Sequence, residues 1–170
     1  MTELWDIYNG CMEKTGRVHE RGVPLEKGDY HLVVHIWPVN RNGQLLIQRR
    51  AETVKRHPGM WSVTGGSVLS GEDILSGMKR ELSEELGLSA GSYEPHLAFI
   101  LRRHDSFAGV YFCFADVEAE ELSLQEEEVA EVKWVTRQQI SSMLDSGSFL
   151  LSSDYTEMLY NEIDRIKDFI

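Results

Sequence analysis

Short apolar runs bounded by turn-forming residues recur along most of the chain, and they predict a β-rich fold. The predicted strands cover 4–9, 16–21, 31–39, 44–50, 60–66, 96–103, 110–118 and 131–135. The Asn42-Gly43 pair is a strong signal for a hairpin between two of these strands. Ser106 to Gly109 predicts a second hairpin turn, and the first two strands predict an N-terminal hairpin.

A different hydrophobic period begins near Asp73. Apolar residues recur there every fourth position, which predicts an amphipathic helix that ends at Gly87. Ser70 followed by Asp73 resembles a capping box at its start. Two more helices are predicted near 137–145 and 152–168. This order of strands and helices predicts an α/β fold with a mixed sheet and helices on both faces.

Three glutamates share one flank of the first predicted helix. Glu81, Glu84 and Glu85 are neighbours at helical spacing, and like charges so close repel one another. Hard oxygen ligands suit Mg²⁺ or Mn²⁺, so this flank is a candidate metal site, with a solvated acidic face as the alternative. Arg80 lies among the acids and can pair with Glu72 across the start of the helix, or form an ordinary surface ion pair.

The spacing of these residues is itself a motif. Residues 66–88 read GSVLSGEDILSGMKRELSEELGL, in which a glycine, a glutamate and the sequence RELxEExGL stand at fixed distances. This arrangement resembles the Nudix box. The chain is therefore similar to the Nudix superfamily, enzymes that hydrolyse diphosphate linkages with the help of divalent cations.

The resemblance implies an α/β/α sandwich with a mixed central sheet and roles for particular residues. It implies that Glu81, Glu84, Glu85 and the carbonyl of Gly65 are metal ligands. It also implies that Arg80 and Glu72 brace the three glutamates. A last carboxylate is expected from a later loop, as a metal ligand or general base. Our candidate is Glu128, six residues before Trp134, with a solvated acidic loop as the alternative.

The N-terminal part, roughly residues 3–62, resembles isopentenyl diphosphate isomerase and the Nudix proteins close to it. The segments that show this resemblance are HERGVPLEKGDYHLVVHIWPVN, GQLLIQRR and PGMW. The isomerases have a reactive Cys, a Gly and a metal-binding His where this chain has Gly65, Gly66 and Ser67. Proton transfer at carbon needs such groups, so we expect hydrolysis instead. An isomerase-like enzyme and a non-catalytic Nudix ligand-binding module are the alternatives.

A phosphate-bearing substrate must be met by local cations, because the net charge of the chain is −11. Arg49 and Arg50 end a strand near the box, and alternation turns at most one of them toward it; solvated edge charges are the alternative. His31 and His35 alternate on another strand, where packed, hydrogen-bonded histidines are expected.

Composition narrows the setting of the protein. With 170 residues, 42% of them hydrophobic, we expect one domain over residues 1–170. The negative charge argues against binding to nucleic acid or to an anionic membrane. Two cysteines without metal-ligand spacing, and a start without a signal peptide, predict a cytoplasmic protein. The resemblance implies a small-molecule diphosphate substrate and leaves a homodimer open.

Overall fold

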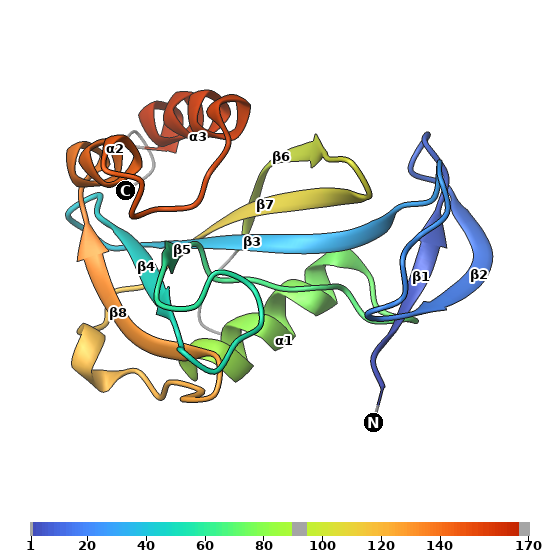
Figure 1. Ribbon diagram of the computed structural model, residues 1–170. Helices are drawn as coiled ribbons and strands as arrows, with labels where there is room; N and C mark the ends of the chain where they lie inside the picture. The colour runs from blue at the N-terminus through green and yellow to red at the C-terminus, as the bar shows by residue number, and fades with distance from the viewer. Residues whose placement is uncertain (1, 90–94, 167–170) are drawn as a thin grey trace.

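The computed structural model of the protein describes residues 2–89 and 95–166, which form an α/β/α sandwich around a six-stranded mixed sheet (Figure 1). The strands of this sheet are β3 (His31–Val39), β4 (Leu45–Arg50), β5 (Trp61–Ser62), β6 (His96–Arg102), β7 (Ser106–Phe114) and β8 (Val129–Val135). They run in the order β5-β4-β3-β7-β6, and β8 pairs with β4. β3 and β7 are parallel, whereas the other pairs are antiparallel.

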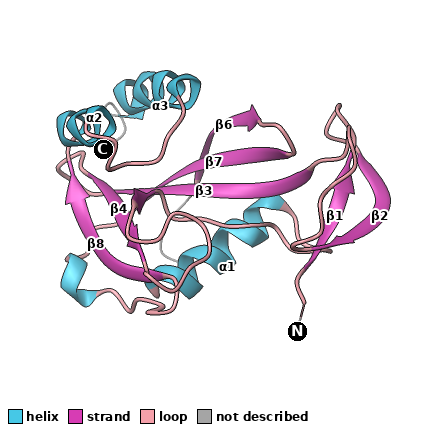
Figure 2. Cartoon of the chain, in the orientation of Figure 1, coloured by secondary structure: helices cyan, strands magenta, loops and turns pink. Residues whose placement is uncertain are grey.

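Helices cover both faces of the sheet (Figure 2). α1 (Ile74–Leu86) packs on one face, where Leu82 is fully buried against alternate residues of β3. α2 (Arg137–Asp145) and α3 (Ser153–Ile166) cover the other face, where Leu159 is fully buried with Trp37 of β3. A short 3₁₀ turn, η2 (Ala119–Glu121), precedes β8. The two apolar faces of β3 thus confirm the predicted sandwich.

The N-terminal strands β1 (Leu4–Tyr8) and β2 (Lys14–Glu20) form the predicted hairpin, which is a separate two-stranded sheet. Figure 1 shows the hairpin at the end of the sandwich that lies away from α2 and α3. It contacts the loop before α1, where the Ser70 amide donates to the Leu4 carbonyl at 2.7 Å.

The loop before α1 enters the sheet between β3 and β4. These two strands pair only at Val39 and Leu45. Residues 61–68 follow the gap: β5 pairs with β4, and bridges at Thr64 and Ser67 then join the loop to β3. The strand predicted over 60–66 is therefore much shorter, because the chain changes partner halfway along it.

The predicted turn at 106–109 is wrong. These residues are buried within β7, and the hairpin turn lies three residues earlier, at 103–106, where the Arg103 amide donates to the Ser106 carbonyl at 2.8 Å. Gly109 resembled a turn residue, but it lies beneath α1. A Cβ at Gly109 would come within 2.8 Å of Ile74 Cγ2, so the glycine allows the helix to approach the sheet.

The start of α1 also differs from its prediction. Asp73 alone caps the helix, by accepting from the Ser76 amide, whereas the Ser70 hydroxyl donates to Asp6 of the N-terminal hairpin. Gly87 ends the helix in the left-handed conformation, as predicted. The end of the helix predicted over 152–168 lies outside the described residues. In the described residues, no helix is both long and apolar enough to cross a membrane.

Candidate functional site

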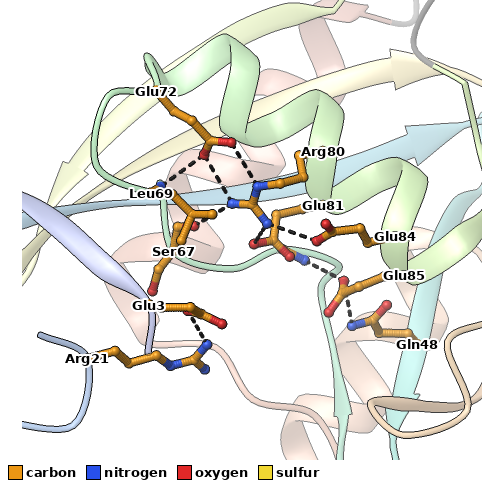
Figure 3. A network of polar contacts seen from close by, with 11 residues as sticks. Glu3, Arg21, Gln48, Ser67, Leu69, Glu72, Arg80, Glu81, Glu84 and Glu85 are labelled. Atoms are coloured by element: carbon orange, nitrogen blue, oxygen red, sulfur yellow. Dashed lines mark hydrogen bonds and ion pairs between the residues drawn. The ribbon is translucent and has the colours of Figure 1, made fainter. Parts of the chain in front are cut away.

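Glu85 is the most deeply buried acid of the candidate site, with 2% of its surface exposed. From α1 it reaches the sheet, where its Oε2 accepts from the Gly65 amide at 3.0 Å and from Gln48 Nε2 at 3.1 Å (Figure 3). Gln48 Oε1 in turn accepts from the Thr64 hydroxyl at 3.0 Å. The helix α1, the loop that precedes it (residues 63–73, called the box loop below) and β4 together fix the Glu85 carboxylate.

Arg80 joins the other acids. Its guanidinium donates to both oxygens of Glu72, at 2.9 and 3.1 Å, and to the Ser67 carbonyl at 2.8 Å. Its Nη1 also donates to Glu81 at 2.8 Å and to Glu84 at 2.9 Å. Burial lowers the pKa of the guanidinium, but the three carboxylates outweigh burial and raise this pKa overall. Arg80 thus ties the start of the box loop to the acidic flank of α1 (Figure 3).

These contacts offset only part of the cost of burying the charged carboxylates. Burial raises the pKa of Glu85 to about 8, and the charges of Glu81 and Glu128 add to this rise against the hydrogen bonds that lower it. Burial likewise raises the pKa of Glu81 to about 7, where Glu84 and Glu128 oppose the effect of Arg80. Glu128 therefore lies close enough to influence both buried acids.

Two glycines shape the backbone beside these carboxylates. Gly65 has φ +146°, and a Cβ there would lie 2.0 Å from the Val34 carbonyl oxygen. A Cβ at Gly66 would lie 2.4 Å from Glu81 Oε1. The backbone therefore excludes a side chain at Gly65, whereas a side chain at Gly66 would displace the Glu81 carboxylate. Gly77 has a different role, because a Cβ there would meet Val68 of the box loop at 3.0 Å.

The two candidate arginines face opposite sides of β4. Arg50 shares the face of Gln48, toward α1, and its Nε donates to the Arg56 carbonyl at 2.9 Å. Arg49 lies on the other face, where its Nε donates to Glu131 at 3.0 Å. The structure therefore brings Arg50, and not Arg49, to the side of the glutamates.

The donors suit a hard divalent cation, although they do not yet enclose one. Over residues 2–89 and 95–166, no three acidic, imidazole or thiol groups converge on a common point. Glu81 and Glu84 both turn to Arg80 instead. Burial, with smaller contributions from neighbouring carboxylates, raises the pKa values of Glu81 and Glu85 despite the donors around them. Carboxylate oxygens in this condition are the ligands that Mg²⁺ or Mn²⁺ favours.

Sequence reasoning missed Gln48 and Thr64, whose side chains lead to Glu85. Both are buried, at 1% and 0% exposure. A polar residue within the apolar run of β4 was the available signal, because a buried amide needs a partner. Spacing within the box says nothing about either residue.

Comparison with known proteins agrees with this geometry. A family model described as the NUDIX domain matches residues 29–152. An uncharacterized Nudix hydrolase of Listeria monocytogenes is 36% identical over 149 residues, 87% of this chain and 88% of that protein. The Escherichia coli Nudix hydrolase YfcD is 34% identical over 149 residues, 85% of this chain and 79% of that protein. The crystal structure of DR0079 from Deinococcus radiodurans has the same fold, with a TM-score of 0.79 at 23% identity over 94% of this chain and 98% of that one.

Proposed function

The chain belongs to the Nudix family, and from this premise we propose that it hydrolyses a diphosphate linkage by attack of water on phosphorus. Its substrate has the form X–P–O–P–Y, either nucleoside-diphosphate-linked or another diphosphate. The observation that carries the proposal is the pair of Glu85, which is buried, and Glu81, which is partly buried; both have raised pKa values and lie beside two glycines, Gly65 and Gly66. Such a pair suits a cation that in turn binds diphosphate oxygens.

The metal ligands in this proposal are Glu81, Glu84, Glu85 and the Gly65 carbonyl, and the ion is Mg²⁺ or Mn²⁺. When bound, such an ion offsets the charge of the diphosphate and lowers the pKa of water. The Gly65 amide and Gln48 hold one oxygen of Glu85, which leaves its other oxygen to act as a ligand.

The remaining residues of the site position these groups or move the proton. Arg80, braced by Glu72, holds Glu81 and Glu84 on the same flank. Glu128 and Glu81 are the two candidates to accept the proton of the attacking water. Arg50, on the α1 side of β4, is the better placed of the two β4 arginines to contact a phosphate.

The loop before α1 argues against the isomerase alternative. A side chain at Gly65, where the isomerases have a reactive Cys, would place its Cβ 2.0 Å from the Val34 carbonyl oxygen. The loop therefore has no room for that thiol, and Ser67 stands where the isomerases have a metal-binding His. Hydrolysis requires no side chain at Gly65.

The test is phosphate release from a panel of diphosphate substrates with Mg²⁺ or Mn²⁺, measured after coupling to a phosphatase. Glu84→Gln and Glu85→Gln should abolish turnover in proteins that keep the wild-type circular dichroism spectrum. Glu157→Gln on the exposed side of α3 is the matched control and should leave turnover unchanged. Turnover of isopentenyl diphosphate without phosphate release would point to the isomerase instead. Tight binding without turnover of any substrate would point to a ligand-binding module.

A further inference from the structure

The N-terminal hairpin lies outside residues 29–152, yet it is fastened to the box loop. The Asp6 carboxylate accepts from the Ser70 hydroxyl and the Gly71 amide, both at 2.8 Å, and pairs with Lys14 at 2.6 Å. These contacts lie just before the first turn of α1. The hairpin is therefore fixed against the box loop, and its side chains have fixed positions relative to the site.

One face of the hairpin carries Glu3, Trp5 and Arg21. Trp5 pairs with His19, the Arg21 amide donates to the Glu3 carbonyl at 2.9 Å, and alternation places Asp6 on the opposite face. Trp5 stacks on His31 of β3, with 4.0 Å between the ring centroids and 10° between the planes. Arg21 Nη1 donates to Glu3 Oε2 at 2.5 Å. Figure 3 draws this ion pair in the same view as Ser67 and the site carboxylates, and the bond from the Ser70 amide to the Leu4 carbonyl holds this end of the hairpin against the loop before α1.

Two ring nitrogens of this stacked pair have no hydrogen-bond partner. Among the described residues, Trp5 Nε1 and His31 Nδ1 are buried atoms without a hydrogen-bond partner. The predicted hydrogen-bonded histidine is thus packed, with 8% of its surface exposed, but not satisfied at Nδ1. Burial lowers the pKa of His31 to about 4, and Arg103 and Arg21 contribute to this shift. Unpaired buried polar atoms of this kind require a partner, and a bound polar group beside the exposed Arg21 would supply one.

Arg21 is also less tightly held than Arg80 and Arg49. Arg80 is held by three carboxylates, and Arg49 by Glu131. Arg21 pairs with Glu3, and the two side chains are 53% and 41% exposed. Such an exposed ion pair contributes little to stability, so a phosphate oxygen can replace Glu3 at small cost. In a chain with net charge −11, this arginine supplies positive charge that a diphosphate needs.

We propose that Arg21 is a substrate-binding residue, which leaves Glu3 and binds a phosphate oxygen of the diphosphate held at the glutamates. The hairpin is then one wall of the active site, with Trp5 and His31 beside the bound group. This inference rests on the proposed function for the location of the diphosphate.

The experiment measures binding of imidodiphosphate, a non-hydrolysable diphosphate, by calorimetry with Mg²⁺ present. Arg21→Gln should raise its Kd about tenfold, because a charge-assisted hydrogen bond is lost. Glu3→Gln should instead lower Kd about two- to threefold, because the competing carboxylate is gone. Arg17→Gln is the matched control, since Arg17 is 52% exposed, lies on the same hairpin and pairs with Asp29. The Kd of the Arg17→Gln variant for imidodiphosphate should stay within twofold of the wild-type value.

Opposite effects of the two substitutions distinguish binding from a merely structural ion pair. If Arg21→Gln and Glu3→Gln weaken binding equally, the pair only holds the hairpin and the proposal is overturned. No change with Arg21→Gln, or no binding of imidodiphosphate by the wild type, overturns it as well. Thermal melting of each variant shows that it is folded. Binding that depends on Arg21 in a protein that hydrolyses no diphosphate would refute the proposed function and leave this inference standing.

Discussion

Replacing Gly65 by alanine should damage both the fold and the site. At φ +146° an L-residue is strained by about 1–2 kcal/mol. The new Cβ would lie 2.0 Å from the Val34 carbonyl oxygen, so the backbone must move. This movement disturbs the bond from the Gly65 amide to Glu85, worth roughly 1.5–3 kcal/mol, and the neighbouring bond from the Val34 amide to the Gly66 carbonyl, worth about 1 kcal/mol.

Together these effects predict a loss of about 4–6 kcal/mol, and therefore a fall in Tm of roughly 10–20 °C for a chain of this size. Differential scanning calorimetry measures it, and the phosphate-release assay should show at least a hundredfold lower activity at a temperature where the variant is folded. Gly16→Ala is the control, because Gly16 also has positive φ, at +79°, but no atom within 4 Å of its Cβ. If both variants melt within 2 °C of each other, the close contact at Gly65 does not matter and the reasoning fails.

Two other predictions follow from buried groups. His31→Phe keeps an aromatic ring on Trp5 but removes a histidine whose pKa is lowered to about 4 by burial. The unfolded chain takes up this proton near pH 6.5, whereas the folded chain does so only near pH 4. The free energy of unfolding of the wild type should therefore fall by about 1–3 kcal/mol relative to the variant as pH falls from 6.5 to 4. Urea unfolding measures this difference, and a difference that does not change with pH would contradict the prediction. Gly109→Ala should cost about 1–3 kcal/mol through its contact with Ile74, and Ile74→Ala in the same chain should recover part of this loss; additive effects in thermal melts would rule out the contact.

Local patterns in the sequence were sufficient to predict the sandwich and the acidic helix. The alternating faces of β3 and the four-residue period of α1 follow from burial of apolar side chains, and the left-handed Gly87 ends the helix. The pairing of Arg80 with Glu72 also follows from the spacing within the box. In each case the residues that interact lie close together in the sequence or repeat with a regular period.

Long-range contacts could not be predicted in this way. Gly109 resembles a turn residue until α1 is known to lie above it. Gln48 is 37 residues from Glu85, and only the fold shows that the two side chains meet. The link between Asp6 and Ser70 spans 64 residues, and it too depends on how the hairpin packs against the loop before α1. Such contacts depend on how elements are packed, which a local pattern does not encode.

Burial of Glu85 would make the proposed site depend on a cation. The Gly65 amide and Gln48 favour the charged carboxylate, yet the pKa of Glu85 is still raised to about 8, because burial outweighs these two donors and Glu81 and Glu128 add repulsion. Neutral donors alone therefore leave the charged form unfavourable. A divalent cation would supply the missing compensation, so that its binding would also stabilise the fold by linkage. The arrangement that makes these acids costly in the metal-free protein is thus the one that would make the site bind a cation tightly.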